Sequence, residues 1–154
     1  MNLLKSVLHN IGVLIVGFVF ASIGRGFDFL LKIPHFGSSL IDIVAVTLLI
    51  IGFLIRVWAT LYFYEQGMAV IRLEPQEKLL TGGPYSFSRN PLYLGGNVFI
   101  FLGAVLLFGS PSGVVLTAIA IVATDLMIRR EEKQLARKFG QQWISYKSRV
   151  RRWI

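Results

Sequence analysis

The sequence contains no cysteine, only two histidines, and little charge for its length. The absence of cysteine excludes disulfides, thiolate metal ligands, cysteine nucleophiles and cysteine-linked lipid anchors. Neither His9 nor His35 has a partner at metal-ligand spacing, so we predict no metal site. Only 16% of the 154 residues are charged and 55% are hydrophobic, whereas soluble domains usually carry about 25% charged residues. The composition therefore predicts a membrane protein, and the length predicts a single domain over residues 1–154.

Four apolar runs in the sequence approach the roughly 20 residues that a helix needs to cross a bilayer. They cover approximately residues 7–24, 40–64, 92–109 and 113–128. Serine, proline and glycine at 110–113 separate the last two runs by a tight turn, since proline cannot donate a hydrogen bond to a continuing helix. None of the runs alternates with the period of two that strands show. We therefore predict an all-α, polytopic membrane protein with about four transmembrane helices and a C-terminal helix outside the membrane.

Lysine and arginine are distributed unevenly around these runs. Grouping alternate connecting segments puts thirteen of them on one face and two on the other, with Arg56 left inside the second run. Because these residues favour the cytoplasmic side of short loops, we predict that both termini, including the tail at residues 129–154, are cytoplasmic. An alternative interpretation of the N-terminus is a secretory signal, with Lys5, an apolar centre and a small-residue cleavage site at Ala21. Cleavage there would leave three spans.

The basic tail has two obvious classes of partner, anionic lipids and nucleic acid. Glu131, Glu132 and large apolar residues interrupt its basic residues, which is unlike a nucleic-acid-binding stretch. Headgroups of anionic lipids attract each basic residue near the surface by about 1 kcal/mol. We therefore predict membrane lipids, and not nucleic acid, as the partner of the tail.

Three charged residues fall within the apolar runs, where charges are rare, costly and usually functional. Asp42 is near the start of the second run and is expected at the interface with the headgroups. Arg56 is deeper in that run, and it either pairs with an acid such as Asp125 or extends its side chain to the headgroups. Asp125 is four residues before Arg129, a spacing at which two side chains form an ion pair on one helix face.

The segment from Lys78 to Gly96, KLLTGGPYSFSRNPLYLGG, leads directly into the third run. Its glycines interrupt helical structure and allow a ligand to approach the backbone closely. Asn90 and Pro91 form a favourable N-cap and first-turn pair, so we predict that the third helix begins there. The free N–H groups of a helix start beside Arg89 fit a carboxylate or a phosphate. The alternative is an ordinary membrane-entry loop, with Arg89 reaching the headgroups.

The sequence from Arg129 to Gly140 predicts a helix that prolongs the fourth run and ends at the glycine. Two adjacent acids, Glu131 and Glu132, stand out among its basic residues. They are either ordinary surface charges or one wall of a pocket. A glutamate close to Arg89 and Asn90 would form a pocket with one cationic and one anionic wall, which suits a zwitterionic ligand that resembles an amino acid.

Two motifs carry a resemblance to a known family. The first consists of Ile55-Arg56-Val57-Trp58-Ala59, Leu79, Thr81-Gly82-Gly83-Pro84-Tyr85 and Arg89-Asn90-Pro91-Leu92-Tyr93-Leu94-Gly95. The second consists of Glu131-Glu132, Leu135, Phe139-Gly140, Trp143, Tyr146-Lys147 and Arg149-Val150. Together they resemble the isoprenylcysteine carboxyl methyltransferase family and its phospholipid methyltransferase relatives. Residues 79–150, about half the chain, align with the pattern of the eukaryotic carboxyl methyltransferases without a gap.

This resemblance implies an integral-membrane methyltransferase that uses S-adenosylmethionine, bound on the cytoplasmic side by a loop at residues 77–91 and the helix after the fourth run. It implies cofactor contacts at Lys78, Leu79, Leu80, Tyr85, Asn90, Pro91, Leu92, Tyr93 and Glu131. S-adenosylmethionine carries a carboxylate, an ammonium and a sulfonium, so the pocket with walls of both signs suits it. Our candidates for polar residues at the catalytic centre are Arg56, Arg89, Asp125 and Glu131.

The sequence departs from the family pattern at two positions. Asn90 replaces the histidine of the eukaryotic enzymes, and an asparagine still caps a helix and donates a hydrogen bond. Met127 replaces an arginine that orients the acceptor carboxylate, one helical turn before the glutamate. We therefore expect a broader class of acceptor than a prenylcysteine carboxylate.

The resemblance, taken with the membrane composition, implies a membrane enzyme that moves a methyl group from S-adenosylmethionine to a lipophilic small molecule or a lipid headgroup. Methyl transfer is an in-line displacement, so the enzyme mainly aligns the reactants and excludes water. A phospholipid N-methyltransferase is the alternative within the enzyme class. A non-catalytic, lipid-binding membrane scaffold is the alternative outside it.

Overall fold

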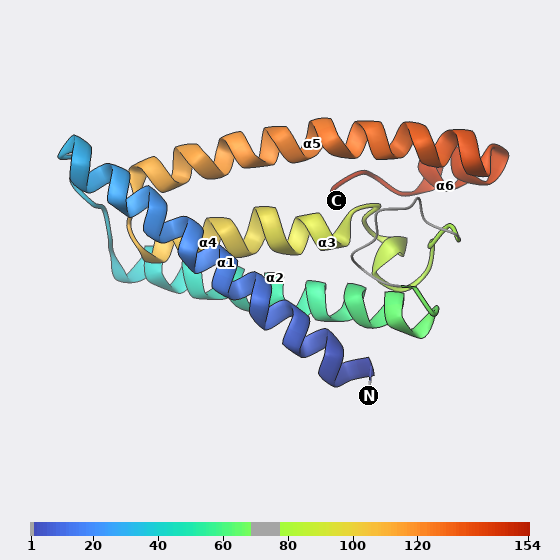
Figure 1. Ribbon diagram of the computed structural model, residues 1–154, viewed down its shortest axis with the longest axis horizontal. Helices are drawn as coiled ribbons and strands as arrows, with labels where there is room; N and C mark the ends of the chain where they lie inside the picture. Colours follow the sequence, from blue (N-terminus) through green and yellow to red (C-terminus); the bar gives the residue numbers. More distant parts are fainter. Residues whose placement is uncertain (1, 69–77) are drawn as a thin grey trace.

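The computed structural model describes residues 2–68 and 78–154, and every regular element in these two ranges is helical (Figure 1). The elements are, in order, α1 (Asn2–Leu31), α2 (Ser39–Glu65), the short 3-10 helix η1 (Gly83–Ser86), α3 (Pro91–Tyr93), the π-helix η2 (Leu94–Ile100), α4 (Phe101–Leu107), α5 (Pro111–Phe139) and α6 (Gln141–Arg149). The predicted all-α class is thus confirmed for the described part of the chain. Two parts of the predictions lie outside the described residues: residue 77 of the predicted cofactor loop, and Arg72, one of the basic residues counted between the second and third apolar runs.

Within the two described ranges, three helices, α1, α2 and α5, are long and apolar enough to cross a membrane. The prediction of about four such helices is wrong, because the predicted third span at residues 92–109 forms a helical run that is shorter than these three helices. That run begins at Pro91 and ends at Leu107, and Gly109 then turns the chain with a φ of 56°. At 1.5 Å per residue its length is about 25 Å, whereas the hydrocarbon core of a bilayer is about 30 Å thick.

The other helices differ from the predicted spans mainly by being longer. α1 contains the predicted span 7–24 and continues to Leu31, so its connection to α2 is shorter than expected. α2 agrees with the predicted span 40–64 to within one residue at each end. α5 contains the predicted span 113–128 and continues through the start of the tail to Phe139, where Gly140, with a φ of 50°, ends it as predicted.

The helices form one bundle in which α1 crosses and contacts α2, α4 and α5 (Figure 1). The contact between α1 and α5 requires glycine, because a Cβ atom at Gly24 would lie 2.5 Å from the Cα atom of Gly113. Membrane helices commonly approach each other closely at such small residues. The packing of α1 on α5 therefore depends on backbone contact at this point.

One end of the bundle, which we call the turn end, contains the α1–α2 connection and the α4–α5 turn. Asp28 of α1 is fully buried there and accepts hydrogen bonds from the Ser110 hydroxyl at 2.5 Å and from the Ser112 N–H at 2.9 Å. The Ser110 hydroxyl also accepts a hydrogen bond from the Gly113 N–H at 2.9 Å and so caps α5. An acid of α1 is therefore fastened to the first turn of α5.

The opposite end, where α2 and α5 finish, contains the predicted site residues, and we call it the site end. A hydrophobic cluster there joins α2, the segment before α3, and α6; its buried members are Phe63, Met68, Leu80, Tyr85, Trp143 and Tyr146. The Tyr146 hydroxyl also donates a hydrogen bond to the main-chain oxygen of Tyr85 at 2.7 Å. α6 therefore holds the segment of residues 78–90 against the end of α2.

Candidate functional site

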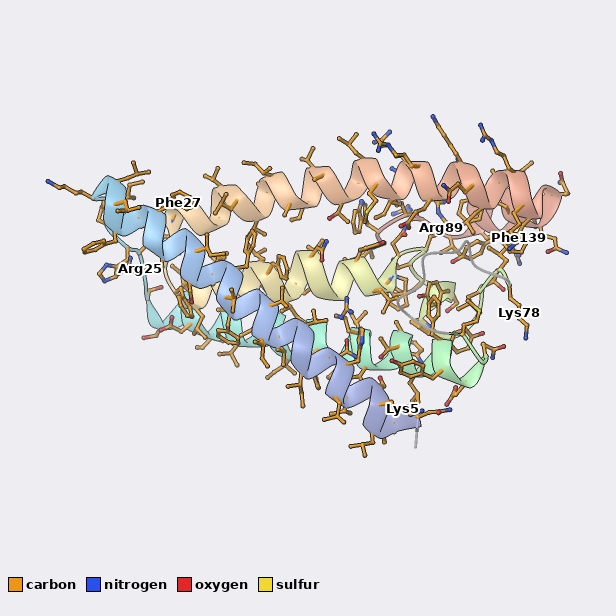
Figure 2. All side chains as sticks on the ribbon, viewed as in Figure 1. Lys5, Arg25, Phe27, Lys78, Arg89 and Phe139 are labelled. Carbon is orange, nitrogen blue, oxygen red and sulfur yellow. The ribbon has the colours of Figure 1, made fainter. Side chains whose placement is uncertain are left out.

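Most of the predicted site residues lie together at the site end. Among the predicted cofactor contacts, Leu80, Tyr85 and Pro91 are buried, Leu79, Asn90, Leu92, Tyr93 and Glu131 are half-buried, and Lys78 is exposed. Leu80 and Tyr85 belong to the hydrophobic cluster, and Leu79 and Leu92 pack against it. Figure 2 shows Arg89 between the start of the α3–α4 run and α5, with Lys78 farther out.

Every nitrogen of the Arg89 guanidinium has a partner within the protein. Nε and Nη2 donate to Oε1 of Glu132 at 3.1 and 2.8 Å, and Nη1 donates to the carbonyls of Lys147 and Val150 at 3.2 and 2.8 Å. The guanidinium also lies over the Trp143 ring, 5.7 Å from the ring centroid. Arg89 therefore neutralises a carboxylate of the protein, and is not the uncommitted cation of the predicted anion site.

The Glu132 carboxylate also forms an ion pair with a second arginine, Arg152. Nε and Nη2 of Arg152 donate to Oε1 and Oε2 of Glu132 at 3.1 and 2.8 Å. The hydrogen bond to Glu132 raises the pKa of the Arg152 guanidinium above its ordinary value. Sequence reasoning missed Arg152 as a site residue, because 20 residues separate it from Glu132 and no periodicity relates the two positions.

Asp125 forms the predicted ion pair with Arg129, in which Nε lies 2.7 Å from Oδ2. Its other oxygen accepts a hydrogen bond from Nη1 of Arg152 at 3.1 Å. Asp125 thus belongs to the same network as Glu132, which lies two turns later on α5. The network contains three arginines and two acids.

Arg56 is buried in the bundle, and neither predicted alternative, pairing with Asp125 or extension to the headgroups, is correct. Its Nε donates to Oδ1 of Asn10 at 2.8 Å, and its Nη1 donates to the carbonyl of Leu92 at 2.7 Å. The glycines at 95 and 96 leave room for this side chain, since a Cβ atom at either position would lie 2.7 Å from an atom of Arg56. Arg56 therefore ties α1 and α2 to the turn that carries Leu92, a predicted cofactor contact.

Glu131 immediately precedes Glu132 on α5 but has a different partner. The Tyr93 hydroxyl donates a hydrogen bond to Oε1 of Glu131 at 2.9 Å. Glu131 forms no ion pair with any residue in the described ranges. Successive residues of an α-helix point about 100° apart, so the two adjacent acids face different surroundings. Among the residues that the structure describes, Glu131 is therefore a half-buried carboxylate without a cation beside it.

Asn90 precedes the third helical run, which begins at Pro91 as predicted, but its side chain does not cap the helix. Instead its Nδ2 donates to the main-chain oxygen of Arg152 at 3.2 Å. The N–H groups of Leu92 and Tyr93, in the first turn, therefore keep their capacity to bind a ligand. The boundary prediction is correct, and the prediction of a side-chain cap is wrong.

The charged groups at the site end thus fall into two sets. Asp125 and Glu132 are compensated by the three arginines of the network. Glu131 is uncompensated, and it is bonded through Tyr93 to a helix start with free N–H groups. Glu131 and the helix start together can hold a ligand that has both a cationic and an anionic group.

A comparison with known protein families identifies the family of the chain. The sequence profile of the phospholipid methyltransferase family matches residues 40–142, about two thirds of the chain, so the chain belongs to this family. No curated protein and no solved structure matches the chain. Family membership and the three long apolar helices identify an integral-membrane protein of a methyltransferase family.

Proposed function

We propose that this member of the phospholipid methyltransferase family transfers a methyl group from S-adenosylmethionine to a lipophilic acceptor. The observation that carries the proposal is the Glu131 carboxylate, which accepts a hydrogen bond from Tyr93 and has no cationic partner in the described ranges. A partly buried charge is costly unless it is paired. An ammonium or sulfonium group of a ligand would supply the missing partner.

The groups around Glu131 fit the charged groups of S-adenosylmethionine. Glu131 suits the ammonium or the sulfonium, and the first-turn N–H groups of Leu92 and Tyr93 suit the carboxylate. Tyr85 and Leu80 supply an aromatic and apolar surface suited to the adenine ring. The proposed contacts are the ones implied by the sequence resemblance: Lys78, Leu79, Leu80, Tyr85, Asn90, Pro91, Leu92, Tyr93 and Glu131.

The cofactor supplies an electrophilic methyl group on its sulfonium. A lone pair of the acceptor forms a bond to the methyl carbon while the carbon–sulfur bond breaks, so the protein mainly aligns the reactants and excludes water. Arg56, Arg89 and Asp125 hold the surrounding segments in place through their hydrogen bonds. Glu131 is the candidate that touches a reactant.

The distribution of charge favours an amine over a carboxylate as the accepting group, as in phospholipid N-methylation. The arginines at 89, 129 and 152 already neutralise acids of the protein. Met127, the position where the resemblance implies a carboxylate-orienting arginine, is exposed on α5. An acceptor carboxylate would meet Glu131 with no cation of the described residues beside that acid, whereas a cationic lipid amine is attracted to Glu131 before it loses its proton.

We also propose that both termini are cytoplasmic. Lys5, Lys78 and Arg89 lie toward the site end, and Arg25 lies at the turn end (Figure 2), as the excess of basic residues on cytoplasmic segments requires. Because the chain has no cysteine, single cysteines can report the orientation. In sealed right-side-out vesicles, a membrane-impermeant maleimide should label Ser39→Cys and not Ser148→Cys. The reverse pattern would overturn the orientation.

Calorimetry with S-adenosylmethionine in detergent tests the function. We expect the wild type to bind, and Glu131→Gln to weaken binding by about 10- to 100-fold, since a charge-assisted contact is worth roughly 1.5–3 kcal/mol. Glu65→Gln, an exposed acid at the end of α2, is the matched control and should bind as the wild type does. Absence of binding by the wild type would overturn the proposal and favour a non-catalytic scaffold.

A second experiment identifies the accepting group. The protein is incubated with methyl-labelled S-adenosylmethionine and lipid extract, and the labelled lipid is then treated with mild base. A methyl ester releases its label as methanol, whereas an N-methyl group keeps it. Release of the label would contradict an amine acceptor and leave the methyltransferase proposal intact.

A further inference from the structure

Residues Val150–Arg152, which we call the 150–152 strap, lie across the segment that leads into α3. The Arg89 N–H donates to the carbonyl of Arg151 at 3.0 Å, and Arg89 Nη1 donates to the carbonyl of Val150 at 2.8 Å. Asn90 Nδ2 donates to the carbonyl of Arg152 at 3.2 Å. The strap thus holds two consecutive residues immediately before Pro91, where the third helical run begins.

The side chain of Arg152 fastens this strap to α5. Two of its nitrogens donate to both oxygens of Glu132, at 3.1 and 2.8 Å, and the third donates to Asp125 at 3.1 Å. One guanidinium therefore joins two turns of α5, while the main-chain oxygen of the same residue holds Asn90. Glu131 is adjacent to Glu132, so the same contacts fix the turn of α5 that presents Glu131.

We propose that Arg152 is a positioning residue of the candidate site, which sets the distance between the Asn90–Tyr93 segment and the Glu131 turn of α5. Its effect on cofactor binding rests on the proposed function. Arg152 lies beyond residues 40–142, the region matched by the family profile, so the match does not supply this role. The contacts on both sides of the site supply it.

The contacts of Arg152 require a planar fork and not merely a positive charge. Its three nitrogens each donate to a carboxylate oxygen, on two acids that lie on different turns. Arginine supplies several donors in a fixed plane, whereas the lysine ammonium is a compact point charge on a flexible stem. When the Arg152 guanidinium is removed, Arg89 is the one described residue that still neutralises Glu132.

The test compares Arg152→Ala and Arg152→Lys with two controls. Arg151→Ala removes an exposed side chain from the same strap and keeps the carbonyl that binds Arg89. Ser110→Ala removes buried hydrogen bonds at the turn end, so it destabilises the bundle away from the site. Three quantities are measured in the same detergent: the Kd for S-adenosylmethionine, the hydrogen-exchange rate of the Arg89 amide, and the Tm.

We expect Arg152→Ala to weaken cofactor binding by about tenfold, because it removes a half-buried partner of the Glu132 carboxylate and frees the segment that binds the ligand. It should also accelerate exchange of the Arg89 amide. Arg152→Lys should recover only part of either effect. Arg151→Ala should change neither quantity, and Ser110→Ala should lower the Tm while leaving both unchanged.

Two results would overturn the proposal, and a third separates it from the proposed function. Unchanged Arg89 exchange in Arg152→Ala would show that the side chain does not hold the segment. A change in Kd no larger than that of Ser110→Ala, at an equal loss in Tm, would reduce Arg152 to a general stabilising role. If the wild type binds no S-adenosylmethionine, the proposed function fails, and the exchange rates still decide whether Arg152 positions the segment.

Discussion

The two ends of the bundle each bury an acid of a long apolar helix, and they satisfy it in different ways. At the turn end, Asp28 accepts hydrogen bonds from neutral donors, the Ser110 hydroxyl and the Ser112 N–H. At the site end, Glu132 lies between two guanidinium groups, and its neighbour Glu131 has a tyrosine hydroxyl as its partner.

This difference separates a structural joint from a candidate site. At the turn end one acid meets local donors of the α4–α5 turn, and the contacts close a helix start without any outside partner. The site end gathers several ionised groups in a partly buried place, and such clusters are typical of functional sites. Of these described acids, Glu131 is the one that the arginines leave uncompensated, and it is therefore the one that we propose binds a ligand.

The largest expected effect comes from Glu132→Ala. This change leaves Arg89 and Arg152 without their shared carboxylate, so we expect the free energy of unfolding to fall by about 3–5 kcal/mol. Asp28→Ala at the turn end leaves only neutral donors unpaired and should cost about 1–3 kcal/mol. Denaturant unfolding in detergent measures both. Equal losses would remove the distinction between the two ends.

Glycine substitution at the turn end should have an intermediate effect. A Cβ atom at Gly24 would lie 2.5 Å from the Cα atom of Gly113, so Gly24→Ala should cost about 1–3 kcal/mol by forcing α1 and α5 apart. Gly26 has no atom within 4 Å of its Cβ position, and Gly26→Ala should hold or slightly raise the Tm because alanine is the better helix former. The same Tm for both variants would contradict a tight joint.

The smallest expected effect appears at alkaline pH and at the site end. Burial raises the pKa of the Tyr85 and Tyr146 hydroxyls above the ordinary value of 10.0. The unfolded chain therefore releases these protons first, so stability is complete below about pH 10 and falls as the pH rises above it. Tyr146→Phe should cost about 1 kcal/mol at neutral pH, through loss of its bond to Tyr85, and should show a shallower alkaline decline.

The slope of this decline is read from unfolding free energies measured between pH 8 and pH 11, a range set by the usual tyrosine pKa of about 10. Tyr64→Phe, which changes a half-buried tyrosine outside the hydrophobic cluster, is the control. A wild-type decline that runs parallel to that of Tyr146→Phe would show that this hydroxyl does not contribute.

The helix positions could be predicted from the sequence because their signals are local. α2 agrees with its predicted span to within one residue, and the breaks at Pro91, Pro111 and Gly140 are where the sequence indicates them. The third run ends two residues before its predicted end, since nothing in its composition shows that the run contains a π-helix and stops at Leu107. Its length depends on packing against α2 and α5.

Partners of polar side chains were predicted correctly only where the two residues are close in sequence. The Asp125–Arg129 pair follows from helical spacing and is present. The partners of Arg56 are Asn10 and the Leu92 carbonyl, 46 and 36 residues away, and no periodicity connects them. Membrane hydropathy locates a buried charge, but it does not show which helix covers it.

The sequence by itself determined an all-helical membrane chain, the start of the third helix at Pro91, and two unusual acids in the basic tail. Only the tertiary structure decided the partner of each acid: Glu132 forms ion pairs with Arg89 and Arg152, and Glu131 accepts a hydrogen bond from Tyr93. The physical reason is that adjacent helical positions differ by about 100° in direction, so their partners come from whichever elements pack on each side.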